Sequence, residues 1–401
     1  KALNLGSAAA PSRGGNLGEA HIMLGEGSSL NAVAGEYTVG AVDGYGVVSS
    51  SAGGRLVAEA IGASSKVATV NASQGSIHSK SNIHTDTLTI KGGMVSSDHG
   101  IQVTNLVQDM NGTLTANGDI FLEGGATNAQ GRIKTGADLI LEGDITKAAD
   151  GTLDIIVDKN IKALDRDIEA TNLQAKSMKA KDVSVEGGSL LLTNTSTVDS
   201  LKLTKAGISV ADLTVSNDVI MTNGSAGMID KLKTNGNFTI GEAGSDGVSL
   251  VVKEMTTTAG TGALTFDLDW GYASNNAAIE KLNYNAITDS NAVNNALRVG
   301  RNSYVALGTT DKGWLPSVVQ GGLREDGVET VLGLAKPLVV QSTGSIELNS
   351  DAGYVAGSGW ASATNSATFA DNSLLVINGQ NIYGDKAAIS FKNPGTLSVA
   401  E

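Results

Sequence analysis

Short runs of alternating apolar and polar residues recur along the chain. Three examples are Leu88-Thr89-Ile90, Val183-Ser184-Val185 and Leu201-Lys202-Leu203. Alternation with a period of two buries one face of a β-strand and exposes the other. The runs end in Gly, Asn or Asp, which tolerate a positive φ where the chain turns a corner. The pattern therefore predicts many short strands joined by tight turns.

A longer repeat organises these runs. The segment 117–125 (Asn-Gly-Asp-Ile-Phe-Leu-Glu-Gly-Gly) recurs as 136–144 (Gly-Ala-Asp-Leu-Ile-Leu-Glu-Gly-Asp), with Asp, Glu and the first closing Gly in the same places. A Gly-(Ser/Thr/Ala)-(Leu/Ile) tripeptide recurs at gaps close to multiples of the same interval, beginning at Gly75, Gly112, Gly151, Gly188 and Gly262. One unit cannot bury its apolar face alone, whereas stacked units pair every strand and share one core. The sequence therefore predicts an all-β fold, a parallel β-helix (solenoid) with rungs of about 19 residues.

An antiparallel sandwich or meander is the main alternative, because it also has short strands and glycine-rich turns. Asn-Gly pairs, which favour hairpin turns, begin at Asn111, Asn117, Asn223, Asn235 and Asn378. An echo at a fixed interval is not expected of a sandwich, however. We therefore favour the solenoid.

Composition narrows the class of protein further. The chain has 401 residues, including 51 Gly and only 4 Pro, which fits a repetitive β-structure with many turns. Its net charge of −13 argues against a nucleic-acid partner. The absence of Cys excludes disulfides, thiolate metal sites and a Cys nucleophile. No run approaches the roughly 18 apolar residues of a membrane-spanning helix, so we expect no transmembrane segment.

The distribution of aromatic residues predicts four regions. Residues 1–45 are rich in Gly and Ala and alternate weakly, which suggests irregular coils, and residues 46–265 form the regular solenoid. Eleven of the 15 aromatic residues lie from Phe266 onward, as do three of the four Pro. We therefore expect an aromatic-rich insert at 266–340 and a continuation of the solenoid at 341–401.

The insert carries signals for two short helices. Ser290 is placed to cap a helix over 291–299, which Gly300 would end. Asp326 and Glu329 have the spacing of a capping box, and Pro337 would close the helix that they begin. The sequence thus predicts a small helix-containing insert in the C-terminal third.

The repeats resemble those of bacterial surface adhesins. The echoed units at 117–125 and 136–144 are similar to the short repeats of filamentous-haemagglutinin-type proteins. The stretches 370–379 and 395–400 resemble the passenger repeats of autotransporters. This resemblance implies a right-handed β-helical stalk, secretion to the exterior of a Gram-negative outer membrane, and adhesion or self-association.

The segment 266–272 (Phe-Asp-Leu-Asp-Trp-Gly-Tyr) is the most suggestive candidate for a binding site. Strand alternation would place Asp267 and Asp269 on one face, beside Trp270 and Tyr272. Two such carboxylates could cleave a sugar chain, although a solvated strand face explains them as well. We expect no catalytic residues, and propose sugar stacking by these four residues, with Trp314 and Trp360 as further aromatic candidates.

The sequence supports a metal site less well than it supports the sugar-binding site. His78, His84 and Asp86 lie close in the sequence, but a metal would need further ligands. Turn carboxylates such as Asp218 and Asp351 could stack to hold Ca²⁺, yet the nonapeptide array of calcium-binding solenoids is absent. We therefore expect no metal centre and no cofactor, with Ca²⁺ as an option at the turns.

These observations favour a non-enzymatic extracellular β-helical rod of a bacterial surface adhesin. Its partner would be a host or bacterial surface glycan or protein, or another copy of the chain. One alternative is a subunit of an end-to-end filament, because open strand edges invite pairing between chains. A second alternative is a β-helical polysaccharide-cleaving enzyme or phage tailspike, which would need a carboxylate cleft around Asp267 and Asp269.

Overall fold

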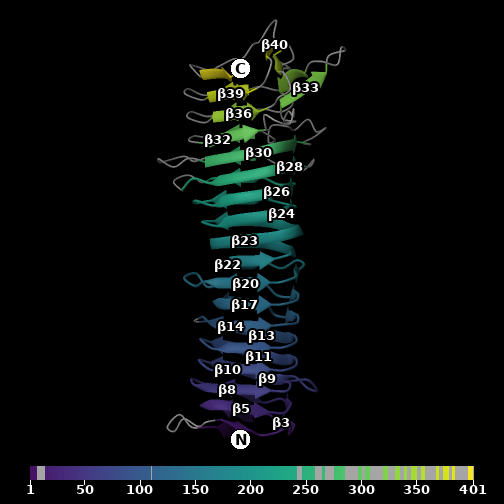
Figure 1. The fold of residues 1–401 in the computed structure, drawn as a ribbon, viewed down its shortest axis with the longest axis vertical. Coiled ribbons are helices and arrows are strands. Elements are labelled where there is room, and N and C mark those ends of the chain that lie inside the picture. The colour runs from purple at the N-terminus through teal and green to yellow at the C-terminus, as the bar shows by residue number, and fades with distance from the viewer. Residues whose placement is uncertain are drawn as a thin grey trace. The chain divides into compact units, whose positions relative to one another are not determined.

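The structure is a computed structural model that describes residues 1–6, 14–109, 111–241 and 246–257. Beyond these it describes the backbone of strands β29 to β41. The chain forms two compact units, Lys1–Leu192 and Thr193–Glu401. In both units short parallel strands stack rung upon rung (Figure 1). The chain is therefore a parallel β-solenoid, as the repeat predicts, whereas its handedness stays an expectation from the resemblance.

Three faces, here named A, B and C, make up each rung of the first unit. Face A contains β1 (Ala2–Leu5), β4 (Ser29–Ala32), β7 (Val47–Ser50), β9 (Val67–Ser73), β16 (Ala126–Ala129) and β19 (Ile145–Lys147). Face B contains β2 (Gly15–Asn16), β5 (Gly35–Val39), β8 (Gly54–Ala58), β10 (Ser76–Ser79), β12 (Met94–Ser97), β14 (Thr113–Ala116), β17 (Gly131–Thr135) and β20 (Leu153–Val157). Face C contains β3 (Ile22–Leu24), β6 (Val42–Gly44), β15 (Ile120–Leu122), β18 (Leu139–Leu141) and β21 (Asn160–Ala163).

Some strands turn a corner and serve two faces. β11 (Ile83–Lys91) and β13 (Ile101–Asp109) each begin on face C and end on face A. β22 (Ile168–Ala175) runs from face A to face B. β23 (Ser177–Thr204) is the longest strand and contributes to all three ladders.

In the main sheet of the second unit, the described strands also form three parallel ladders. One contains β25 (Val219–Thr222), β27 (Phe238–Ile240), β29 (Leu264–Phe266), β31 (Leu297–Val299), β35 (Leu338–Val340) and β38 (Ala367–Phe369). A second ladder begins with the first halves of β24 (Gly207–Val215), β26 (Ala226–Thr234), β28 (Ser249–Thr257) and β30 (Asn275–Tyr284). It continues with β32 (Ser303–Leu307), β36 (Ser345–Asn349), β39 (Leu374–Asn378) and β41 (Thr396–Ala400). The second halves of β24, β26, β28 and β30 form the third ladder.

A separate small sheet belongs to the second unit. Its strands are β33 (Val319–Leu323), β34 (Thr330–Leu334), β37 (Tyr354–Ala356) and β40 (Ile382–Tyr383), and β33 pairs antiparallel with β34. The strands β31 and β34 occupy residues that the sequence assigned to two helices, so the helix predictions are wrong at 297–299 and 330–334. Apolar residues such as Val331 and Leu332 gain ladder pairing as strands, and sheet pairing overrides capping motifs of this strength.

The first 45 residues are more regular than the sequence suggested. Strands β1 and β4 pair in register, and β3 pairs with β6 through Ile22 and Val42. The pairing shows that complete rungs begin before residue 46. The compositional limits of the four proposed regions otherwise stay a prediction.

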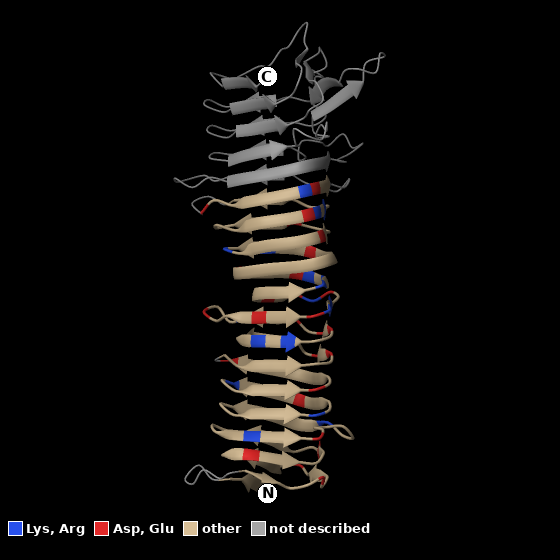
Figure 2. Ribbon diagram, viewed as in Figure 1, with Lys and Arg blue, Asp and Glu red and all other residues tan. Residues whose placement is uncertain are grey.

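The core consists of columns of aliphatic side chains that repeat from rung to rung. On face C the inward column is in register, and each member is at most 2% exposed: Ile83, Ile101, Ile120, Leu139 and Ile161. Burying one such side chain contributes roughly 1.5–3 kcal/mol. Charged residues, in contrast, lie outside these columns, both at the turns and within the strands of the described rungs (Figure 2).

Two glycines show why the corners require this residue. Gly131 has a φ of 95°, and a Cβ there would lie 2.1 Å from the carbonyl oxygen of Gly112. Gly125 has a φ of 73°, and its Cβ would lie 2.0 Å from the carbonyl oxygen of Asp144. Adjacent rungs approach too closely here for any side chain. Glycine is therefore a packing requirement at these two corners.

Candidate functional site

The residues proposed from the sequence as a sugar site lie outside the described residues. These are Asp267, Asp269, Trp270, Tyr272, Trp314 and Trp360. The backbone of β29 ends at Phe266, immediately before the acidic pair. The structure therefore neither brings these side chains together nor separates them, and their role stays a prediction.

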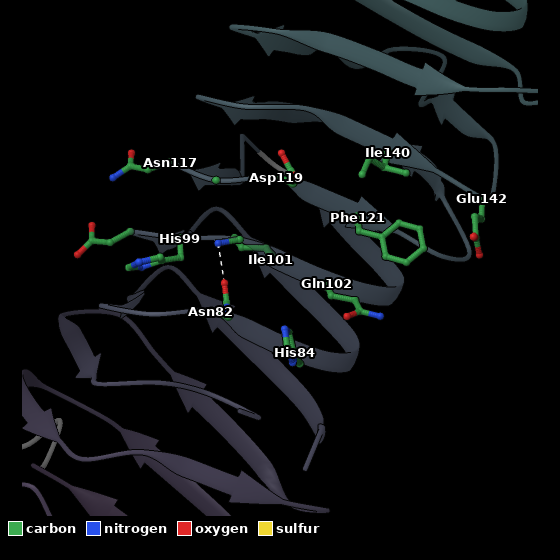
Figure 3. A pocket seen from close by; sticks show the side chains of 13 residues that line it. Asn82, His84, His99, Ile101, Gln102, Asn117, Asp119, Phe121, Ile140 and Glu142 are labelled. Atoms are coloured by element: carbon green, nitrogen blue, oxygen red, sulfur yellow. Dashed lines mark hydrogen bonds between the residues drawn. The ribbon is translucent and has the colours of Figure 1, made fainter. Parts of the chain in front are cut away.

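A groove of about 700 Å³ lies on face C of the first unit. Its floor is a column of outward side chains in strict register: His84 pairs with Gln102, Gln102 with Phe121, and Phe121 with Ile140. Figure 3 shows Phe121 and Ile140 on neighbouring strands, with Gln102 and His84 on the strands before them. All four are half-buried. The floor is thus apolar at one end and polar at the other.

The first rim of the groove is the corner where face B turns into face C. Asn117 and Asp119 are exposed there, as is His99 one rung earlier (Figure 3). The Asn82 side-chain oxygen accepts a hydrogen bond of 2.9 Å from the backbone N–H of Gly100, which joins two rungs. This contact fixes the corner, and Asn117 and Asp119 place an amide and a carboxylate along the rim.

Asp119 begins a short ladder of carboxylates along this rim. Its Oδ1 accepts the backbone N–H of Asp138 at 3.0 Å, and Asp138 in turn lies 2.5 Å from the Lys162 ammonium. Burial alone would raise the pKa of Asp138, but hydrogen bonds from Lys162 and Asn160 lower it below its usual value. The carboxylates of Asp119 and Asp138 are therefore both hydrogen-bonded to residues of the next rung.

The opposite rim is the corner where face C turns into face A, and Glu142 is the residue of this corner that lines the groove. Glu123 lies at the same corner one rung earlier, outside the lining. Its carboxylate accepts hydrogen bonds of 2.6 Å from the Thr104 hydroxyl and 2.6 Å from the Gln102 amide, and it lies 3.1 Å from the Lys66 ammonium. Thr104, Gln102 and Lys66 lower the pKa of Glu123 to about 2, against the opposing effect of burial. Glu123 is therefore ionised and firmly held.

Glu142 occupies the equivalent position one rung further on. The backbone N–H of Glu142 bonds to the carbonyl of Leu122, so the two glutamates are stacked neighbours. Glu142 lines the groove and its side chain is exposed. Among the described residues, its carboxylate has no hydrogen bond or ion pair. One of two equivalent acids is thus enclosed by the protein and the other is open.

A second enclosed carboxylate, Asp43, lies on β6 away from the groove. Its side chain is 1% exposed and lies 2.6 Å from Nε2 of His21. Burial raises the pKa of Asp43, but hydrogen bonds from the backbone N–H groups of Ser64 and Ser65 and from His21 lower it further than burial raises it. Asp43 therefore has a structural role, because its hydrogen bonds to Ser64 and Ser65 hold the turn after β8 against the preceding rung.

The histidines proposed as weak metal candidates have other surroundings. His78 lies on face B, 3.0 Å from the Ser96 hydroxyl and 3.4 Å from Asp98, whereas His84 lines the groove. Within the described part of the chain, no three His, Asp or Glu side chains are grouped so that they could hold a metal ion. Asp218 accepts two hydrogen bonds from Asn237, which fits a turn role. Calcium at the turns stays a prediction, and Asp351 lies outside the described residues.

Sequence reasoning did not single out the groove, although one signal for it was present. Phe121 is one of two aromatic residues between Tyr45 and Phe266, and the other, Phe238, is fully buried. The repeat places Phe121 and Glu123 in the same positions as Ile140 and Glu142. Strand alternation would thus have predicted an outward apolar pair flanked by two acids.

Comparison with known proteins adds no family to this description. No family model, no curated protein and no solved structure matches the chain significantly. Within the described residues, no helix is long and apolar enough to cross a membrane. The geometry of the groove is therefore the basis for a functional proposal.

Proposed function

We propose that the protein is a non-enzymatic, extracellular β-solenoid of the bacterial surface-adhesin type, which binds a partner through the groove on face C. The observation that carries this proposal is the outward pair of Phe121 and Ile140, set between two polar rims. Apolar side chains flanked by polar groups are the usual lining of ligand sites. The partner is a glycan or protein of a host or bacterial surface, or another copy of the chain.

The architecture supports binding rather than chemistry. Rungs in register hold outward side chains on a rigid framework, which keeps the entropy cost of binding low. The groove is open and shallow, and its carboxylates lie on opposite rims or are tied into the stack, as Glu123 is. The net charge of −13 favours solubility of such a surface-displayed chain.

An attachment assay with purified chain tests the proposal. Fluorescent beads coated with the chain would be applied to epithelial cells and, separately, to bacteria, and bead clumping would report self-association. We expect attachment or clumping by the natural chain and at least a tenfold loss in the Phe121→Thr variant. Threonine is compatible with an outward strand position but removes the aromatic surface.

The Ile156→Thr variant is the matched control. Ile156 is also a half-buried, outward apolar residue of the first unit, but it lies on face B. We expect this variant to attach as the natural chain does. Equal attachment by the Phe121→Thr variant and the natural chain would refute the groove as the binding site, and release of reducing sugar from a polysaccharide would refute the non-enzymatic assignment.

A further inference from the structure

The groove is strongly biased in charge. Three carboxylates contribute to its lining, from Asp98, Asp119 and Glu142, and in this described part of the chain no lysine or arginine does. Asp98 has His78 as a neighbour at 3.4 Å, and Asp119 is bonded to the next rung. Glu142 is the acid that has no partner among the described residues. Positive charge in a ligand would therefore be complementary to this lining.

The corner beside the groove shows how a row of stacked acceptors holds a cation. The Lys66 side chain extends along the corner between faces C and A, and its ammonium lies 3.7 Å from Asp86, 3.0 Å from Thr104 and 3.1 Å from Glu123. These acceptors come from three successive rungs, so a single lysine spans them. The row of acceptors continues to Glu142 one rung further, where Lys66 makes no contact in the described structure.

We propose that the groove binds an extended peptide segment in which a lysine or arginine alternates with apolar residues, and that Glu142 accepts its cationic group. This inference rests on the proposed function, because it names the ligand class of the same groove. The cationic group pairs with Glu142 as Lys66 pairs with Glu123. The apolar neighbour packs on Phe121 and Ile140, which project from adjacent strands (Figure 3).

The dimensions of the groove fit such a segment. The floor extends over four rungs, from His84 to Ile140. Rungs are spaced by about 4.8 Å, so the floor is roughly 14 Å long. An extended peptide advances about 3.3 Å per residue, which corresponds to four or five residues. The aromatic ring of Phe121 also attracts a cation that lies over its face.

Binding of short labelled peptides tests the inference. The probes are the end-capped pentapeptides Lys-Leu-Lys-Leu-Lys and Glu-Leu-Glu-Leu-Glu, and maltotetraose represents a neutral sugar. We expect fluorescence anisotropy to show binding of the lysine peptide alone by the natural chain. The Glu142→Gln variant should bind it about three- to tenfold more weakly, because the variant keeps the shape of the side chain and removes its charge.

Glu26→Gln is the matched charge control. Glu26 is exposed in the turn between β3 and β4, away from the groove lining. Its substitution by Gln changes the net charge of the chain by the same amount as the Glu142→Gln substitution. We expect this variant to bind the lysine peptide like the natural chain. An equal loss in both variants would overturn the inference, because the attraction would then come from the net charge alone. No loss in either variant would overturn it too, because Glu142 would then not accept the cationic group.

The remaining outcomes separate the inference from the proposed function. Binding of maltotetraose without binding of the lysine peptide would overturn the peptide inference and leave a sugar-binding adhesin groove. Failure of both probes, with attachment that still depends on Phe121, would also overturn the peptide inference alone. Attachment that is independent of Phe121 would overturn the proposed function itself.

Discussion

The rungs that carry Glu123 and Glu142 share the repeat of 117–125 at 136–144 and equivalent backbone hydrogen bonds, yet the side-chain contacts of the two acids differ. Glu123 has three partners and a pKa of about 2, whereas Glu142 is exposed and has none among the described residues. The difference comes first from Thr104 and Gln102 on the preceding rung and then from Lys66, which precedes Glu123 by 57 residues. The equivalent neighbours of Glu142 are Glu123 and Phe121, whose side chains donate no hydrogen bond. In a stacked repeat, side chains from earlier rungs therefore decide whether an acid at an equivalent position is held by the protein or left exposed.

The largest effect is expected at the glycine that follows the Glu123 corner. The Gly125→Ala variant introduces a Cβ 2.0 Å from a backbone oxygen at a positive φ, so the rungs must separate. We expect a loss of about 3 kcal/mol or more in the free energy of unfolding. Thermal unfolding followed by circular dichroism would measure this loss.

The equivalent residue of the next rung provides the control. The Asp144 side chain accepts one hydrogen bond of 3.0 Å, from the backbone N–H of Asp167, and Asp144 does not have a positive φ. The Asp144→Ala variant should therefore lose only about 1 kcal/mol. Similar losses in the two variants would show that the corners do not restrict their residues as the structure indicates.

A smaller effect is expected from removing the charge of Glu123. The Glu123→Gln variant keeps the size of the side chain but loses the ionic partner of Lys66 and weakens two short hydrogen bonds. We expect a loss of about 1–3 kcal/mol in the stability of this region. Hydrogen exchange of the backbone amides in β13 and β15 would detect the loss locally, and unchanged exchange would contradict the role given to Glu123.

The same network predicts a pH dependence. Because the folded structure lowers the pKa of Glu123 from 4.5 to about 2, its contribution is present above about pH 4.5 and disappears as the pH falls towards 2. The difference in stability between the natural chain and the Glu123→Gln variant should therefore shrink over this range. Chemical denaturation at pH 6, 4 and about 2.5 would measure it, and a constant difference would refute the assignment.

The smallest effect on stability is expected at Glu142. Its exposed side chain has no partner among the described residues, so the Glu142→Gln variant should change the free energy of unfolding by less than about 0.5 kcal/mol. Parallel denaturation curves of this variant and the Glu123→Gln variant would test the contrast directly. A loss at Glu142 as large as that at Glu123 would mean that the two acids have the same structural role.

Much of the fold follows from the sequence because its signals are local and repeated. The echo between 117–125 and 136–144 predicts that Ile120 and Leu139 stack, and they pair in register in the core. The contact between Lys66 and Glu123 has no such signal, since a flexible side chain that crosses three rungs leaves no periodic pattern. Capping motifs at residues 326–335 are weak local signals, and the pairing of β33 with β34 overrides them.

The register of the groove has a consequence for how such a chain changes over generations. Ile140 follows Phe121 at the same sequence interval as Glu142 follows Glu123. An in-frame duplication or loss of one such segment adds or removes a whole rung and keeps every other side chain on its face. The number of rungs that carry an apolar residue and an acid can therefore change by one at a time. A binding groove of this kind could become longer or shorter, and fit a longer or shorter ligand, while the core stays the same.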